Sequence, residues 1–192
     1  MTNRREFLQA ATALSAAPLV SRATFAGVHD TVHLDAVIYD NRYTQAQYFG
    51  ARARRLGAEV HEITGDITDL WQQELLQRWQ NNPAAILGLT ERPALFLLER
   101  LAWDHGLRVM FEAEHVTGAI EPVHRITRPG NTSLQRGLAI AGQDWPAILA
   151  ESLIDGDRII SPDTSPTGSA LAGRLDEPTT LVSWVIGPRG GA

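Results

Sequence analysis

Between residues 33 and 116 the sequence alternates four short apolar segments with three segments of helical periodicity. The apolar segments are residues 35–39, 59–63, 84–89 and 107–111. They are rich in β-branched and large aliphatic side chains, as buried parallel strands are. Between them, apolar residues recur every three or four positions, which is typical of amphipathic helices. The alternation therefore predicts a βαβαβαβ unit with right-handed crossovers.

Glycine and proline residues support these boundaries. Gly57 and Gly106 follow the first and third predicted helices, where a left-handed residue commonly ends a helix. Asn81–Pro83 ends the second helix, because proline cannot continue it. Asp66 and Thr90 precede the second and third helices, and we expect both to act as N-caps.

We therefore expect an α/β fold: a three-layer sandwich around a mainly parallel sheet of flavodoxin-like or Rossmann-like type, with strand order 2-1-3-4 plus a C-terminal strand at Thr179–Ile186. Val123–Arg128 alternates with period two, which predicts an antiparallel edge strand. A further helix is expected to begin at Asp144. The third helix of the repeat, Pro93–His105, is apolar on nearly every side, so we expect other elements to bury it. A polar loop is expected over residues 161–178 and a disordered end after residue 186.

Composition excludes several kinds of site. The chain has no cysteine, which excludes disulfides, thiolate nucleophiles and cysteine-ligated metal sites. It has no lysine, so its 17 basic residues are all arginine and a Schiff-base or phosphate-loop lysine is excluded. The net charge of −5 without a basic stripe argues against nucleic acid as a partner.

The first 26 residues have the pattern of an export signal. Arg4 and Arg5 are followed by Phe7-Leu8, then by an alanine-rich apolar run and a small-residue end at Ala26. This segment resembles a twin-arginine (Tat) signal peptide. The resemblance implies export of an already folded protein to the periplasm, often with a cofactor or a partner. We thus expect a signal at residues 1–26, a single α/β domain at 27–192, and no stable membrane span after signal removal.

A ligand site is expected where strand order reverses, beyond the carboxyl ends of the strands. The loops Asp40–Thr44 and Thr90–Arg92 would line that crevice, and both lead into helix N-termini that favour an anion. The candidate ligand-binding residues are Asn41, Arg42, Thr44, Thr90 and Arg92. The alternative is that Asp40, Thr44 and Thr90 only cap the two helices.

The fourth strand ends in a run of titratable residues, Glu112 to His115. Strand alternation places Glu112 and Glu114 on one face and His115 on the other. His124 could approach His115 across a hairpin, but no third ligand is evident, so no metal site is predicted. The candidate catalytic residues, for acid–base chemistry, are Asp40, Glu91, Glu112 and His115.

The sequence contains neither a nucleophile elbow nor a glycine-rich dinucleotide fingerprint. It specifies no cofactor, and whether the chain is an enzyme stays open. We expect a periplasmic accessory or small-ligand-binding protein, partnered by another exported protein or by a small anionic ligand. The alternative is a small hydrolase, isomerase or lyase. Most of the five tryptophans should be core, whereas an exposed tryptophan patch would mark a partner surface.

Overall fold

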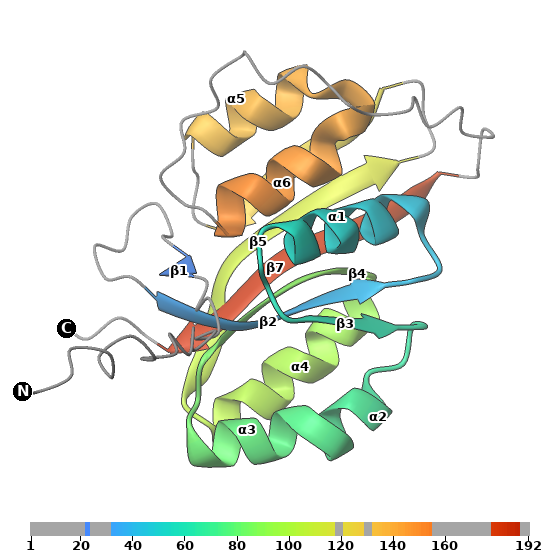
Figure 1. The fold of residues 1–192 in the computed structure, drawn as a ribbon. Coiled ribbons are helices and arrows are strands. Elements are labelled where there is room, and N and C mark those ends of the chain that lie inside the picture. Colours follow the sequence, from blue (N-terminus) through green and yellow to red (C-terminus); the bar gives the residue numbers. More distant parts are fainter. Residues whose placement is uncertain (1–21, 24–31, 118–120, 129–131, 155–177, 189–192) are drawn as a thin grey trace, which may run out of the picture.

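The computed structural model describes residues 22–23, 32–117, 121–128, 132–154 and 178–188, which form a mixed β-sheet with helices on both sides (Figure 1). The strands are β1 (Arg22–Ala23), β2 (Val32–Asp40), β3 (Val60–Ile63), β4 (Ala85–Thr90), β5 (Leu107–Thr117), β6 (Val123–Arg128) and β7 (Thr179–Pro188). The helices are α1 (Thr44–Arg55), α2 (Thr68–Leu70), the π-helical segment η1 (Trp71–Leu75), α3 (Leu76–Asn81), α4 (Arg92–Asp104), α5 (Thr132–Ile140), the 3-10 turn η2 (Gly142–Asp144) and α6 (Trp145–Ile154).

The strand order is β3-β2-β4-β7-β5-β6, with β1 also paired to β2. β3, β2 and β4 are parallel, whereas β7 runs antiparallel to both β4 and β5. The predicted α/β fold is therefore confirmed, as is the antiparallel edge strand β6. The predicted strand order is wrong at one place, because β7 separates β4 from β5, and the sheet is mixed rather than mainly parallel. The reason lies in β7 itself, since Leu181–Gly187 is buried throughout, as a central strand requires.

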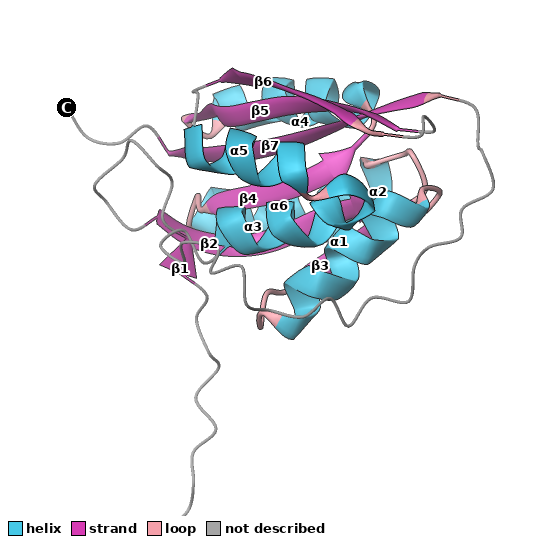
Figure 2. Cartoon of the chain, turned by 90° about the horizontal axis from the view of Figure 1, so that it is seen from above, coloured by secondary structure: helices cyan, strands magenta, loops and turns pink. Residues whose placement is uncertain are grey.

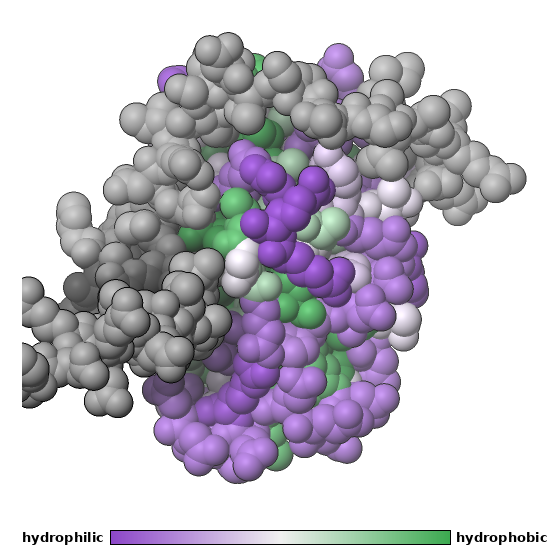
Figure 3. All heavy atoms as spheres, in the orientation of Figure 1, coloured by the Kyte–Doolittle hydropathy of each residue, from purple (hydrophilic) through white to green (hydrophobic). Residues whose placement is uncertain are grey.

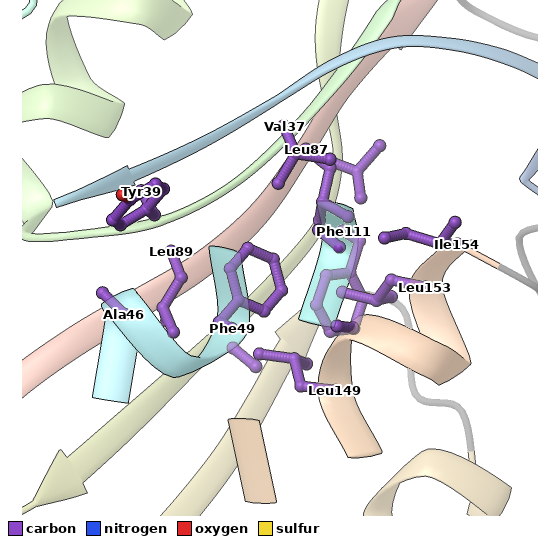
Figure 4. Packing of buried hydrophobic residues seen from close by; sticks show 14 of the residues in the cluster. Val37, Tyr39, Ala46, Phe49, Leu87, Leu89, Phe111, Leu149, Leu153 and Ile154 are labelled. Carbon is purple, nitrogen blue, oxygen red and sulfur yellow. The ribbon is translucent and has the colours of Figure 1, made fainter. Parts of the chain in front are cut away.

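Each face of the sheet has its own core. α1, α5 and α6 cover one face, and α3 and α4 cover the other (Figures 1 and 2). On the first face Phe49 of α1 and Leu149 of α6 pack over Leu87 (Figure 4). On the second face Trp79 and Trp184 are fully buried. The described residues that Figure 3 shows at the surface are mostly hydrophilic, with small apolar areas.

The third helix of the repeat, α4, is not buried on all sides as its composition predicted. Its inner side, with Leu95 and Leu98, packs on the sheet, but Phe96 is 52% exposed and Trp103 is 43% exposed. A helix on an outer layer has only one sheet to cover it, so its remaining apolar side chains face outward. Three of the five tryptophans are nevertheless core, as expected, namely Trp79, Trp145 and Trp184.

Several local predictions can be compared with the backbone. Gly57 and Gly106 follow α1 and α4 with φ of 86° and 75°, which confirms the two left-handed helix ends. α6 begins at Trp145, next to the predicted start, whereas α5 was not predicted. The predicted signal lies outside the described residues except for β1, as does nearly all of the loop at 161–178. The expected disorder after residue 186 is wrong for residues 187–188, which extend β7. Among the described residues, none of the helices has the length and apolar character that crossing a membrane requires.

Candidate functional site

The carboxyl ends of β2 and β4 meet at one rim of the sheet, and an ion pair joins their loops. Arg42 donates from Nη2 to Glu91 Oε2 at 2.7 Å. The loop after β2 enters α1 on one face of the sheet, and the loop after β4 enters α4 on the other. The rim is therefore the point where the strand order reverses. α/β folds commonly bind their ligands at this point. The two loops are adjacent, as the sequence predicts.

Arg42 is held in this rim by a buried carboxylate. Its Nε donates to Asp40 Oδ1 at 2.9 Å, its Nη2 donates to Oδ2 at 2.6 Å, and its backbone N–H donates to Oδ1 at 3.2 Å. Asp40 is fully buried, whereas 42% of the Arg42 side chain is exposed. The hydrogen bond to Asp40 raises the pKa of Arg42, and that to Glu91 reinforces the effect, so the guanidinium keeps its charge.

Two neighbours shape the space around the guanidinium. Gly65, in the loop after β3, has φ of 88°, and a Cβ there would lie 2.6 Å from Arg42 Cζ. The Tyr43 ring centre lies 5.2 Å from the same carbon. Burial and, to a smaller extent, the hydrogen bond with Glu91 raise the pKa of Tyr43 to about 12. The hydroxyl of Tyr43 therefore stays protonated and can donate a hydrogen bond. The rim therefore offers the Tyr43 hydroxyl as a hydrogen-bond donor beside a fixed positive charge.

The helices that start at this rim have no side-chain caps. Neither α1 nor α4 receives a side-chain hydrogen bond at its N-cap residue, Tyr43 or Glu91. The predicted capping role of Thr90 is therefore wrong, because its buried hydroxyl accepts from Trp184 Nε1 and donates to the carbonyl oxygen of Glu91, both at 3.0 Å. Thr44 is exposed as the first residue of α1. Within the part of the chain that the structure describes, neither helix has a side-chain cap for its first-turn N–H groups, and such groups favour an anion.

The other residues of the two loops have structural contacts. The backbone N–H of Asn41 donates to the carbonyl of Ile63, and its own carbonyl accepts from Gln47 Nε2. Gly88 of β4 faces Trp184, and a Cβ on this glycine would lie 2.2 Å from Cζ2 of that ring. A core side chain therefore fills the space beside this glycine.

A second ion-pair network follows the rim toward β6. Arg92 donates to Glu112 Oε1 at 3.1 Å and to Glu114 Oε1 at 2.5 Å, and Arg125 also pairs with Glu114. The hydrogen bonds from Arg125 and Arg92 lower the pKa of Glu114. Both glutamates therefore lie on the α4 face, as alternation predicts, and Arg92 is already neutralised by them.

Comparison with family models, with curated proteins and with solved structures gives no match for this chain. The function therefore has to follow from the chemistry of its own residues. Two further groups of titratable residues bear on it.

His115 lies apart from the other candidate catalytic residues. It faces α6, where its ring stacks on Trp145 at 4.4 Å between centroids, with Nε2 2.7 Å from Ser183 Oγ and Nδ1 2.8 Å from His124 Nδ1. The predicted approach of His124 is thus confirmed. β5 is three strands from β2, or about 14 Å at the usual strand spacing. The structure does not bring His115 to Asp40, so the expected shared acid–base site does not form.

Ser183, His115 and His124 are connected as the members of a proton relay are. Unlike such a relay, Ser183 and His115 are not accessible to a substrate. Ser183 and His115 are fully buried. Burial, together with the neighbouring His124, lowers the pKa of His115 well below its usual value, so this imidazole is neutral. With both nucleophile and base enclosed, the cluster fixes α6 on the sheet rather than presenting a nucleophile. No local motif in the sequence marks Ser183, which lies 68 positions from His115.

A His–Glu cluster on the opposite edge was also missed from sequence. Glu59, His61 and Glu74 each have a possible ligand atom within 4.8 Å of the others. However, Arg78 pairs with Glu59 and, at 3.3 Å, with Glu74. The His61 ring turns Nε2 to Glu59 and Nδ1 to Glu74, so no single nitrogen faces both carboxylates. This geometry suits an ion-pair network better than the convergent ligands of a metal.

Proposed function

We propose that this chain is a periplasmic binding or accessory protein that holds a small anionic ligand at the rim between β2 and β4. Arg42 is the observation that carries the proposal. Buried Asp40 fixes its guanidinium by two hydrogen bonds, and the described residues provide no acceptor for its Nη1. A fixed, partly exposed fork with free N–H groups is suited to a carboxylate or a phosphate.

Glu91 occupies the place that such a ligand would take. Its carboxylate is 36% exposed and pairs with the outer side of Arg42, whereas Asp40 binds the inner side. An exposed ion pair contributes about 0–1 kcal/mol, so a ligand can displace Glu91 at small cost. Breaking the buried pair with Asp40 costs more, which keeps Arg42 oriented when Glu91 leaves. The first turns of α1 and α4 add donors on either side.

The location in the periplasm rests on the resemblance of residues 1–26 to a Tat signal, and association with another exported protein fits that route. We further propose that the sheet is the middle layer of a three-layer α/β sandwich. The alternative function, acid–base catalysis by Asp40, Glu91, Glu112 and His115, has less support. Its histidine faces α6, and Glu112 is paired with Arg92.

Isothermal titration calorimetry with inorganic phosphate and with acetate tests the proposal. Glu91→Gln removes the competing carboxylate, so we expect it to bind either anion about two- to fivefold more tightly than wild type. The double variant Asp40→Asn/Arg42→Gln removes the guanidinium without leaving a buried charge unpaired, and we expect it to lose binding. Arg125→Gln, which removes a different guanidinium from the same rim, is the control.

The control should bind as wild type does. Failure of wild type to bind either anion would contradict the proposal, as would undiminished binding by the double variant. A circular dichroism spectrum of each variant separates loss of the ligand from loss of the fold.

A further inference from the structure

The outward side of α4 carries a stack of aromatic and guanidinium groups. Arg100 Cζ lies 5.2 Å from the ring centre of Phe96 and 4.4 Å from that of Trp103, so the guanidinium contacts both rings. Arg108, at the start of β5, approaches the same indole at 5.8 Å. Phe96, Arg100 and Trp103 follow one another at i, i+4 and i+7, so they form one stripe along the helix. Leu97, 46% exposed, lies beside it. We call these five residues the α4 patch.

The two arginines of the α4 patch have no carboxylate partner among the described residues. Arg108 donates to the carbonyl oxygen of Leu107 at 2.6 Å, and Arg100 contacts the rings of Phe96 and Trp103. Other arginines of the described chain do have such partners, namely Arg42, Arg52, Arg78, Arg92 and Arg125. Two like charges therefore converge on one exposed indole without a direct ion pair to a carboxylate of the described residues, although the chain as a whole is acidic.

We infer that the α4 patch is a docking surface for a protein partner that presents carboxylates next to apolar side chains. Tryptophan and arginine are the residues most enriched among those that dominate binding energy at interfaces. Stacking holds the plane of Arg100 while leaving its in-plane N–H donors free for a carboxylate. Exposed Phe96 and Leu97 supply the apolar contact that an isolated charge pair would lack.

A protein partner fits these observations better than an anionic membrane. The net charge of −5 opposes an extended negative surface, and Glu99 and Asp104 flank the stripe on the same helix. Two neighbouring cations instead match two neighbouring carboxylates, because the attraction between such groups acts within a Debye length of about 8 Å. The inference extends the accessory role proposed above, but it uses residues separate from Arg42 and Glu91, so either can fail alone.

The test uses a defined probe, a synthetic peptide that alternates glutamate with leucine and phenylalanine, and the same peptide with glutamine in place of glutamate. Heteronuclear NMR of the full-length protein reports which amides and indole N–H groups respond. We expect the acidic peptide to bind, and the Trp103→Ala variant to weaken it about tenfold, within the range of interface hot spots. Arg100→Gln should weaken it severalfold. Arg136→Gln, which removes an exposed arginine from α5 on the other face, should leave it unchanged.

Four results of the peptide and vesicle experiments would overturn the inference. They are no binding of the acidic peptide, equal binding of the glutamine peptide, equal binding by Trp103→Ala, and binding of phosphatidylglycerol vesicles in place of the peptide. A fifth is a dimer of the free chain, detected by light scattering, that Trp103→Ala dissociates, which would assign the patch to a second copy. Anion binding at Arg42, measured on the same variants, should be unaffected, which keeps the two proposals distinguishable.

Discussion

We expect acid to destabilise this chain through one buried imidazole. The loss of stability should begin at a pH well above that at which carboxylates become protonated. His115 is fully buried against Trp145 and Ser183, and burial lowers its pKa well below the usual value. In the unfolded chain the same group has a pKa of about 6.5. Below that pH the unfolded state binds a proton that the folded state does not, so stability falls as the pH decreases.

The size of the effect follows from the linkage relation. Each pH unit below about 6.5 costs about 1.4 kcal/mol for one such proton, so the loss between pH 7 and pH 5 is about 2 kcal/mol. Burial also lowers the pKa of His124, which adds in the same direction. The carboxylates whose pKa is lowered, Glu59, Asp66 and Glu114, lose their contribution only below about pH 4.5. The window from pH 7 to pH 5 therefore reports on the histidine cluster.

Urea unfolding followed by circular dichroism at a series of pH values measures this loss. His115→Gln should be less stable at pH 7 but should lose about 2 kcal/mol less than wild type on acidification. Ser183→Ala is the control, because it leaves His115 buried without its partner. It should lower stability by about 1–3 kcal/mol at every pH and keep the wild-type slope. Equal stability of wild type at pH 7 and pH 5, or a wild-type slope for His115→Gln, would show that burial of His115 does not cause the loss.

Two glycine substitutions test the packing that supports the rim. Gly88→Ala places a methyl group 2.2 Å from a carbon of the buried Trp184 ring, so we expect a loss of about 3 kcal/mol in urea unfolding; wild-type stability would show that β4 and β7 are not paired in this register. Gly65→Ala adds a side chain at φ of 88° and displaces the Arg42 guanidinium, so we expect a loss of about 1–2 kcal/mol together with weaker phosphate binding in calorimetry. Unchanged phosphate binding by Gly65→Ala would mean that this guanidinium does not hold the anion.

The parallel part of the sheet was predictable because its signals are local. β4 is a short apolar run, β2 is apolar from Ala36 to Tyr39, and β3 is bounded by apolar Val60 and Ile63. The boundaries carry their own glycine, proline or acidic residues. The rim followed from these elements and from the handedness of crossovers, which is how Arg42 and Glu91 were placed together from positions 49 residues apart.

The position of β7 was not predictable in this way, since strand order depends on pairing between distant segments. The complementary fit of Gly88 to Trp184 is one sign that β4 and β7 are neighbours, but it is recognisable only when both strands are seen together. The same separation in sequence hid the contact of Ser183 with His115. The exposed side of α4 was mispredicted for a different reason, because composition alone does not show whether one layer or two cover a helix.

Phosphate titration followed by ¹H–¹⁵N correlation spectra locates the anion residue by residue, and so decides whether one anion binds between β2 and β4. We expect the largest amide shifts in the first turns of both helices at the rim, at Ala46 of α1 and Ala94 of α4, with a smaller shift at Gly65. The Asp40→Asn/Arg42→Gln variant should show none of them. Shifts confined to one helix or to the α4 patch, or no shift in wild type, would contradict a shared anion site between β2 and β4.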